Sequence, residues 1–371
     1  MTAARQTLPA DLVSLSDHEA RARQALDAGV WAYVQGGAAD ELTLRANHQA
    51  WQALSLAPRV LRPLAHGHTR LRLLGRELAH PLIVAPMAHQ RLLHPHGEAA
   101  TAVAASAQGA GFVLSTQSNT PMEDICRLVR DEAERGPLWF QLYWQASADA
   151  TLQLVRRAEA AGFEALVLSV DAPVSGVRDA ERRHPLQFPP DVHAVHLQGM
   201  PVPPLPDLLP GQSRLFDQLL LQAPGWDDVA WLRAQTRLPL LLKGVTHPAD
   251  ATQAIALGVD GLILSNHGGR TLDTVPATAQ LLPAMARAIH GAVPLIVDGG
   301  LRRGTDVLKA IALGASAVMV GRPVLHGLAN AGALGVAHVL RLLRDELDVA
   351  MALCGCRTLA DVGPGVLWPG A

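Results

Sequence analysis

The 371-residue sequence has few cysteines and tyrosines and almost no net charge. The three cysteines, Cys126, Cys354 and Cys356, argue against a disulfide-rich scaffold in a chain of this length. The pair Cys354-Gly-Cys356 lacks the second pair of ligands that a zinc site needs. A net charge of −2 does not indicate nucleic acid as a partner. We therefore expect reduced thiols, no metal site and no nucleic-acid function.

Long apolar segments are also missing. The first residues contain no apolar core of a signal peptide, and no uninterrupted run approaches the roughly 18 apolar residues of a membrane span. With 49% hydrophobic and 17% charged residues, the chain still has ample material for a large core and is not disordered as a whole. These features predict a soluble, cytoplasmic protein without stable membrane association.

From about residue 80, short apolar runs alternate with alanine-rich stretches of helical spacing. The runs are continuous rather than alternating, as in parallel strands that are buried on both faces. Glycines such as Gly111, Gly162, Gly258 and Gly314 precede the runs and are expected to end the helices. The predicted strands span 82–86, 112–115, 139–143, 165–170, 239–242, 260–265, 293–298 and 316–320, and examples of the helices span 97–109, 148–161 and 304–313.

Eight strand–helix units predict an α/β protein in which a single domain, residues 1–371, forms a closed (β/α)8 barrel. An open doubly wound sheet is the alternative, but no GxGxxG motif follows the first strand. Residues 1–79 are expected to form a helical cap over one end, with helices at 16–36 and 40–53.

One long insertion, residues 172–237, interrupts the alternation and is expected to be a loop or lid. Eight of the 26 prolines lie between positions 185 and 210, where regular structure is disfavoured. Residues 213–222 predict a short amphipathic helix, and packing against the barrel is favoured over membrane contact.

Active sites of such barrels lie at the carboxyl ends of the strands. The sixth strand is followed by Ser265-Asn266-His267-Gly268-Gly269-Arg270. A neutral imidazole accepts a proton near pH 7, and a nearby arginine binds a carboxylate through two parallel hydrogen bonds. His267 and Arg270 therefore indicate an acidic substrate that loses a proton, although a lone histidine at a strand end can also be structural.

The fourth and fifth strands end in further charged residues. Asp171 could orient His267 and stabilise its protonated form, or it could cap a helix. Arg178 is a second candidate for binding a carboxylate, with an ordinary surface arginine as the alternative. Lys243 is costly to bury unless it meets an anion, which suits the negative charge of a reduced cofactor.

Glycine and arginine follow the last two strands, in Asp298-Gly299-Gly300-Leu301-Arg302-Arg303-Gly304 and in Gly321-Arg322-Pro323. Barrels often bind phosphate with these two loops, because glycines admit close approach to backbone N–H groups and helix N-termini attract anions. We predict a phosphate site there, with a pair of tight turns as the alternative. A phosphorylated cofactor would then lie beside an acidic substrate.

These motifs resemble the FMN-dependent L-2-hydroxy acid oxidase and dehydrogenase family, from about residue 18 to residue 358. The matching segments are PLIVAPMA, FQLYW, LVRRAEAAGFEALVLSVDAP, LPLLLKGV, SNHGGRTLD, DGGLRRGTDVLKAIALGA and VGRPV. The resemblance implies that His267 is the catalytic base, with Asp171 as its partner. It also implies that Arg178 and Arg270 bind the substrate carboxylate. Tyr33 and Tyr143, the only tyrosines in the chain, match the two active-site tyrosines of the family.

The same resemblance implies FMN as the cofactor and the residues that hold it. The expected contacts are with the flavin ring and its edge, with the ribityl chain and with the phosphate. The residues concerned are Ala88, Ser115, Gln141, Ser169, Lys243, Ser265, Asp298, Gly299, Gly300, Arg302, Gly321 and Arg322.

The implied reaction is oxidation of an L-2-hydroxy acid to a 2-oxo acid, by hydride transfer or through a carbanion. Dioxygen would be the acceptor and would give hydrogen peroxide; a dehydrogenase that reduces a quinone or cytochrome is the main alternative. An FMN barrel of another class, such as an isopentenyl diphosphate isomerase, and a non-catalytic flavin protein fit the residues less well. Relatives are often tetramers, which implies a homo-oligomer.

Three positions depart from the pattern of plant glycolate oxidases. Gln117 replaces a tryptophan near the substrate, Met87 stands where threonine is common, and Val177 replaces an arginine. We therefore expect a substrate pocket, bordered by Gln117, that admits acids larger than glycolate.

Overall fold

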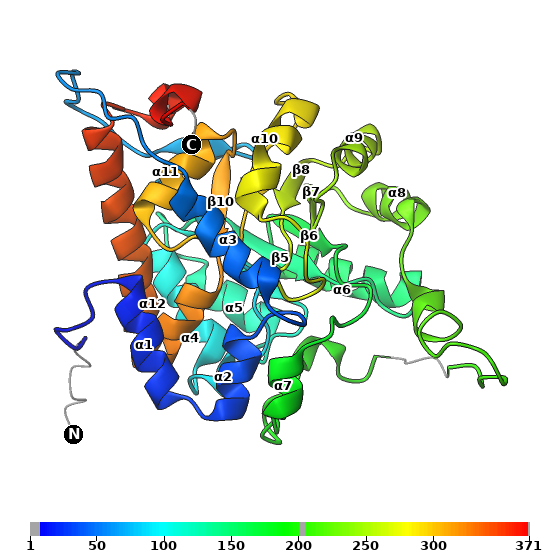
Figure 1. Ribbon diagram of the computed structural model, residues 1–371. Coiled ribbons are helices and arrows are strands. Elements are labelled where there is room, and N and C mark those ends of the chain that lie inside the picture. Colours follow the sequence, from blue (N-terminus) through cyan, green and yellow to red (C-terminus); the bar gives the residue numbers. More distant parts are fainter. Residues whose placement is uncertain (1–7, 201–204, 370–371) are drawn as a thin grey trace.

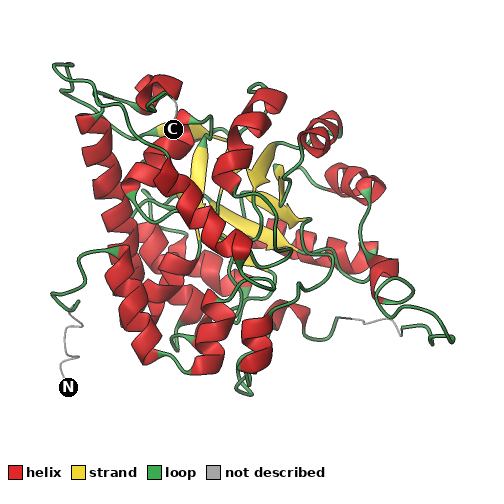
Figure 2. Ribbon diagram, viewed as in Figure 1, coloured by secondary structure: helices red, strands yellow, loops and turns green. Residues whose placement is uncertain are grey.

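The computed structural model describes residues 8–200 and 205–369, and within them eight parallel strands close into a barrel (Figures 1 and 2). The order around the barrel is β10-β3-β4-β5-β6-β7-β8-β9. Every residue of these strands is buried, as their continuous apolar sequences predict. The strands are β3 (Leu82–Val84), β4 (Gly111–Ser115), β5 (Leu138–Leu142), β6 (Ala165–Ser169), β7 (Leu240–Lys243), β8 (Gly261–Leu264), β9 (Leu295–Val297) and β10 (Ala317–Val320). The predicted barrel is confirmed.

Helices surround this barrel and carry the chain from one strand to the next. They are α4 (Gly97–Ala107), α5 (Met122–Val129), α6 (Ala148–Ala161), α8 (Trp226–Gln235), α9 (Pro248–Ala256), α10 (Thr278–Ile289), α11 (Gly304–Ala312) and α12 (Arg322–Leu353). Gly162, Gly258 and Gly314 follow helices with φ of 101°, 78° and 106°, the left-handed conformation expected of them. The expectation for Gly111 is wrong, because it begins β4 and Gly109, with φ of 69°, turns the chain instead.

The N-terminal segment contains three helices, α1 (Leu15–Ala25), α2 (Ala28–Gln35) and α3 (Leu42–Ala53). The segment 16–36 is helical as predicted, but it is divided into two helices. The chain leaves α1 at Leu26, and the Asp27 side chain accepts a hydrogen bond of 2.9 Å from the Val30 amide to cap α2. Residues 1–7 of the predicted cap lie outside the described residues.

A hairpin that the sequence reading missed follows α3. Strands β1 (Leu71–Leu73) and β2 (Arg76–Leu78) pair antiparallel, and Leu73 and Leu78 join the apolar cluster inside the barrel. Arg76 contacts Glu164 and the Arg135 carbonyl, just before β6 and β5 begin, so the hairpin closes the amino ends of the strands. The N-terminal segment therefore does not cap one end alone: the hairpin closes the amino ends, whereas α2 lies beside the carboxyl ends.

The insertion after β6 is only partly a loop. It contains α7 (Asp179–Arg183), short 3-10 turns at Val195–Leu197 and Leu219–Gln222, and then α8, which is the barrel helix before β7. In Figure 1 the part between α7 and α8, in green, extends away from the barrel. The amphipathic helix predicted over 213–222 is wrong, because residues 214–218 form turns and only Leu219–Gln222 form a 3-10 turn. Residues 201–204 of the proline-rich stretch lie outside the described residues.

Helix α12 is the one helix of the described residues that is long and apolar enough to cross a membrane by length and composition. Its apolar stretch is 61% buried inside the protein, and the helix packs against α4, α1 and α11. It is also broken at Ala331 and Gly332, whose backbone angles are not helical. Packing against neighbouring helices therefore accounts for most of its apolar surface.

Three buried histidines make stability depend on pH. Burial lowers the pKa values of His18, His80 and His196 to about 4, whereas an unfolded chain titrates near 6.5. Between these values the unfolded state binds more protons, so the free energy of unfolding falls as pH falls. At pH 5 we expect a loss of about 2 kcal/mol for each histidine. Thermal unfolding measured from pH 7.5 to 5 tests this expectation; an unchanged midpoint would contradict it.

Candidate active site

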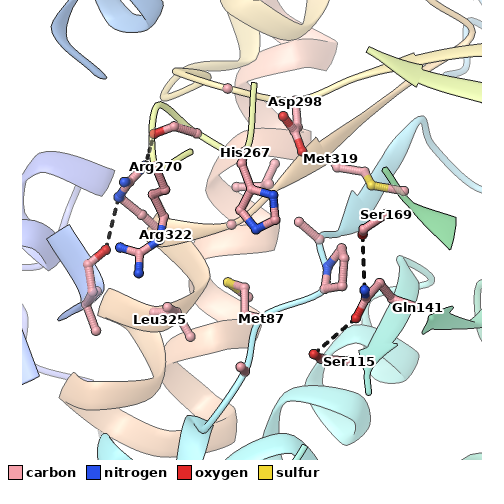
Figure 3. A pocket seen from close by; sticks show the side chains of 18 of the residues that line it. Met87, Ser115, Gln141, Ser169, His267, Arg270, Asp298, Met319, Arg322 and Leu325 are labelled. Atoms are coloured by element: carbon pink, nitrogen blue, oxygen red, sulfur yellow. Dashed lines mark hydrogen bonds between the residues drawn. The ribbon is translucent and has the colours of Figure 1, made fainter. Parts of the chain in front are cut away.

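A cavity opens at the carboxyl ends of the strands. Almost all of the site residues predicted from the sequence line it. Figure 3 shows His267 between Arg270 and Arg322 on one side and Ser169 and Gln141 on the other. Asp171 and Ser265 do not line the cavity and lie behind His267 and Lys243. The predicted residues that do line it are Tyr33, Ala88, Ser115, Gln117, Gln141, Tyr143, Ser169, Arg178, Lys243, His267, Arg270, Asp298, Gly299, Gly300, Arg302, Gly321 and Arg322.

His267 lies in the loop after β8, beyond Ser265 and Asn266, in a left-handed turn with φ of 56°. Its Nδ1 is 3.0 Å from Asp171 Oδ1, and its Nε2 is 3.4 Å from the Tyr143 hydroxyl. Because a carboxylate only accepts hydrogen bonds, Nδ1 carries the hydrogen and Nε2 is left as an acceptor. Gly244 permits this approach, since a Cβ there would lie 2.4 Å from the Asp171 side chain. The site thus presents a proton acceptor at Nε2.

The charge states around His267 follow from burial and neighbours. Burial alone would raise the pKa of Asp171, but His267 and Lys243 lower it below its ordinary value, so the carboxylate stays ionised. Burial raises the pKa of Tyr143 to about 12 and also raises that of Tyr33. Both tyrosines therefore remain protonated and can donate hydrogen bonds.

Two arginines meet on one wall of the cavity. Arg270 Nη1 donates to the carbonyls of Tyr33 and Gly36 at 2.6 and 3.0 Å, and the guanidinium lies 5.2 Å from the centre of the Tyr33 ring. Arg178 approaches from the start of α7 and donates through Nε to the Arg270 carbonyl at 3.4 Å. Glu181 accepts from both guanidinium groups, at 3.2 Å from Arg178 and 3.1 Å from Arg270.

Sequence reasoning missed Glu181. It lies in a segment that was read as an irregular loop, and its contact with Arg270 joins residues far apart in the chain. Its spacing of three from Arg178 was the one local signal that could have found it.

A row of polar side chains crosses the neighbouring strand ends. The Ser115 hydroxyl donates to Gln141 Oε1 at 3.2 Å, and Gln141 Nε2 donates to Ser169 Oγ at 3.1 Å (Figure 3). Ser115 and Gln141 are partners in the register of β4 and β5. The row therefore offers hydrogen-bonding groups to one edge of a polar heterocycle.

Lys243 follows Ser169 in this row, as its register partner on β7. Its Nζ donates to Ser265 Oγ at 2.8 Å and lies 3.2 Å from Asp298. Burial would lower the pKa of Lys243, but Asp298 and Asp171 raise it above its ordinary value, so the ammonium stays charged. Asp298 Oδ1 is buried and has no hydrogen-bond partner among the described residues, which leaves it free to accept from a hydroxyl group.

At the other end of the cavity, the predicted phosphate loops hold two half-buried arginines, Arg302 and Arg322. Among the residues that the structure describes, Arg322 donates only to backbone carbonyls, those of Val34, Gly36 and Gly268, at 2.8–3.0 Å. Burial lowers the pKa of Arg322 to about 9, with Arg270 and Arg302 contributing. A buried guanidinium without a close carboxylate is costly unless an anion joins it.

The start of α11 and the start of α12 lie beside these arginines and add helix N-termini. At Gly300, with φ of 82°, a Cβ would lie 2.2 Å from the Asn47 carbonyl oxygen, so only glycine fits this turn. The anion cradle, the unpartnered Asp298 oxygen and the polar row suit the phosphate, the ribityl hydroxyls and the ring edge of FMN. The residues present therefore fit that cofactor.

Comparison with known proteins agrees with this geometry. The family model described as FMN-dependent dehydrogenase matches residues 22–369. An L-lactate oxidase of Roseobacter sp. (strain GAI101) is 51% identical over 96% of this chain and 94% of its own. A peroxisomal (S)-2-hydroxy-acid oxidase of Oryza sativa subsp. japonica is 43% identical over 94% of each chain. A crystal structure of mandelate oxidase with (S)-2-phenylpropionate superposes with a TM-score of 0.85 at 39% identity, covering 96% of this chain and 98% of that one.

These comparisons confirm the predicted barrel, the FMN cofactor and the class of enzyme, which acts on the CH–OH group of a 2-hydroxy acid. The roles of individual residues stay predictions. On the family match over residues 22–369 and on relatives of up to 51% identity, the chain belongs to the FMN-dependent dehydrogenase family.

Proposed function

We propose that this protein oxidises an L-2-hydroxy acid with dioxygen: R–CH(OH)–COO⁻ + O2 gives R–CO–COO⁻ + H2O2. The observation that carries the proposal is the pairing of His267 and Asp171 at 3.0 Å, in a cavity that also contains Arg178 and Arg270. A proton acceptor beside two carboxylate-binding groups suits the oxidation of an acid next to its carboxylate.

The arginines bind and orient the substrate in this proposal. The substrate carboxylate accepts hydrogen bonds from Arg270 and Arg178, and the buried Tyr33 hydroxyl donates a further one. Because Tyr33 and Gly36 carbonyls hold Arg270 Nη1, the guanidinium loses little freedom when substrate binds. The CH–OH group then lies beside His267 Nε2 and Tyr143.

His267 acts as the base by accepting a proton of that CH–OH group on Nε2. The ionised Asp171 stabilises the resulting imidazolium, and the Tyr143 hydroxyl donates to the substrate hydroxyl oxygen. When bound, FMN would supply the two-electron oxidation, with dioxygen as the final acceptor. Lys243 would lie beside the flavin edge, where its charge offsets the negative charge of the reduced ring.

The electron acceptor distinguishes an oxidase from a dehydrogenase that reduces a quinone or cytochrome. The related proteins named above are oxidases, which supports dioxygen. With L-lactate in air-saturated buffer, we expect one peroxide formed for each pyruvate. Turnover that requires an added quinone, with little peroxide, would instead support the dehydrogenase.

The substrate is expected to be larger than glycolate. Gln117 and Met87, which both differ from the glycolate oxidase pattern, line the cavity, and relatives named L-lactate oxidase support lactate. Values of kcat/KM for glycolate, L-lactate and L-mandelate test this; a sharp preference for glycolate would contradict it.

Arg322 is expected to hold the FMN phosphate. Replacing Arg322 by Gln removes charge-assisted hydrogen bonds worth about 1.5–3 kcal/mol each, so the Kd for FMN should rise about 10²-fold. Quenching of FMN fluorescence during reconstitution measures this Kd. Arg303→Gln is the matched control, because Arg303 is 49% exposed and pairs with Glu346 outside the cavity. Equal FMN affinity in the two variants would contradict the assignment.

The cellular setting is also part of the proposal. We place the enzyme in the cytoplasm as a homo-oligomer, a tetramer by analogy with the family, without stable membrane association. Dioxygen and a small 2-hydroxy acid are its partners, and no nucleic acid is involved.

A further inference from the structure

A second cavity adjoins the first beside His267, the proposed catalytic base. We call it the side chamber; its volume is about 1190 Å³. It lies between the ends of β5–β7 and the part of the insertion that precedes α8. Six residues line both cavities and form the boundary between them: Gln117, Tyr143, Ser169, Ser175, Arg178 and His267.

The walls of the side chamber are mainly apolar. Trp144 follows β5, Val170 follows β6, and Leu215, Leu220 and Trp226 come from the insertion. Apart from the shared Arg178 and His267, Asp250 is the one charged residue among the described residues of its lining. An uncharged apolar group is therefore favoured there, and the one carboxylate of the lining, Asp250, disfavours an anionic group.

The residues shared by the two cavities determine how a bound substrate is oriented. Arg178 binds the carboxylate and His267 meets the CH–OH group in the function proposed above, and both form part of the boundary with the chamber. Gln117 and Ser175 form part of the same boundary, and the remaining substituent on that carbon has to cross it to enter the chamber. The chamber thus begins where the substrate's side chain leaves the reacting carbon.

We propose that the side chamber binds the side chain of L-2-hydroxy acids with a long apolar chain, which makes these acids better substrates than lactate. The inference rests on the proposed function and names the substrate class of the same site. Each added methylene that leaves water is expected to raise kcat/KM about fourfold until the chain fills the chamber.

The experiment uses the FMN-loaded enzyme with L-lactate, L-2-hydroxybutyrate, L-2-hydroxyhexanoate and L-2-hydroxyoctanoate, and with L-2-hydroxyglutarate as an anionic counterpart. We expect kcat/KM to rise along the monocarboxylates and to be far lower for 2-hydroxyglutarate. A constant or falling value beyond lactate overturns the proposal. If no acid of the series reduces the flavin, the proposed function fails instead, so the two failures are distinguishable.

Substitutions in the 3-10 turn Leu219–Gln222 test whether the side chamber causes the preference for long chains. Leu220 lines the chamber, whereas its neighbour Leu221 is 63% exposed and does not. Leu220→Trp should lower the ratio of kcat/KM for 2-hydroxyoctanoate to that for lactate by tenfold or more, and Leu221→Trp should leave both values unchanged. Ala223→Phe fills the same chamber and serves if Leu220→Trp does not fold. An unchanged ratio in a folded Leu220 or Ala223 variant overturns the proposal.

Glu181 contacts both arginines that are proposed to bind the substrate carboxylate. Its carboxylate bridges Arg178 and Arg270, yet Glu181 does not line the cavity that both arginines line. It therefore contacts them from behind. Arg270 Nε and Arg178 Nη2 have no hydrogen-bond partner among the described residues, so each arginine keeps a donor for substrate.

We infer that Glu181 is a positioning residue, which holds two mutually repelling guanidinium groups together for the substrate carboxylate. Glu181→Gln should raise KM for L-lactate about tenfold, with kcat changed by less than about threefold, since one charged hydrogen-bond partner is lost. Glu181→Asp should recover part of the affinity.

Asp179→Asn is the matched control on α7, because Asp179 pairs only with Arg182 and Arg183, outside the cavity. It should leave KM and kcat unchanged. A lower KM in Glu181→Gln would mean that Glu181 competes with substrate. A lower melting temperature with unchanged KM would mean that its role is structural. Either result overturns the inference.

Discussion

Replacing His267 by Gln is expected to lower kcat for L-lactate by about 10³- to 10⁴-fold, because glutamine can hydrogen-bond but cannot accept the proton. Asp171 and Tyr143 would lose the group that they orient, at 3.0 and 3.4 Å in the present structure. Single-turnover reduction of bound FMN under anaerobic conditions measures the chemical step directly. The absorbance spectrum of the flavin reports whether the cofactor is still bound.

His290→Gln is the control for this variant, because His290 is an exposed residue at the end of α10. It should reduce FMN at the wild-type rate. If His267→Gln reduced bound FMN within about tenfold of the wild-type rate, His267 would not be the base, and Tyr143 or water would have to accept the proton.

Replacing Arg270 by Lys is expected to lower kcat/KM by about 10²-fold or more. Lysine keeps the charge but loses the planar pair of donors, and the carbonyls of Tyr33 and Gly36 lose their partners. Loss of one or two charged hydrogen bonds amounts to about 3 kcal/mol. Most of the effect should fall on KM for L-lactate and on the Kd for pyruvate.

The uncharged amide of lactate provides the control for Arg270, because it cannot use the charge of a guanidinium. The low kcat/KM for the amide should change much less than the kcat/KM for lactate when Arg270 is replaced by Lys. An equal loss for acid and amide would show that Arg270 shapes the cavity without binding the carboxylate.

The barrel and the cofactor site were predictable because their signals are local. Buried parallel strands need continuous apolar runs, and the residues that end them lie at one face of the barrel whatever the loops do. Lys243 ends such a run, and His267 and Arg322 lie within three residues after one, so the fold class predicts that all three lie at the same end of the barrel. Tyr33 and Tyr143 came from the family resemblance, since nothing in their spacing marks them.

What the sequence reading missed depends on contacts between distant segments. Glu181 matters because α7 packs beside Arg270, and no local pattern encodes that contact. The break between α1 and α2 depends on the N-cap at Asp27, which interrupts a segment whose sequence pattern is continuously helical. The side chamber exists only once the insertion lies over the ends of β5–β7, and its sequence alone indicated a loop.

The most direct test of the central claim is to mix the FMN-loaded protein with L-lactate without oxygen and then admit air. The account predicts that the flavin absorbance bleaches in the anaerobic phase, that pyruvate forms in equal amount, and that air restores the oxidised spectrum with one hydrogen peroxide per flavin. A flavin that stays oxidised with lactate and with every longer L-2-hydroxy acid would contradict the account.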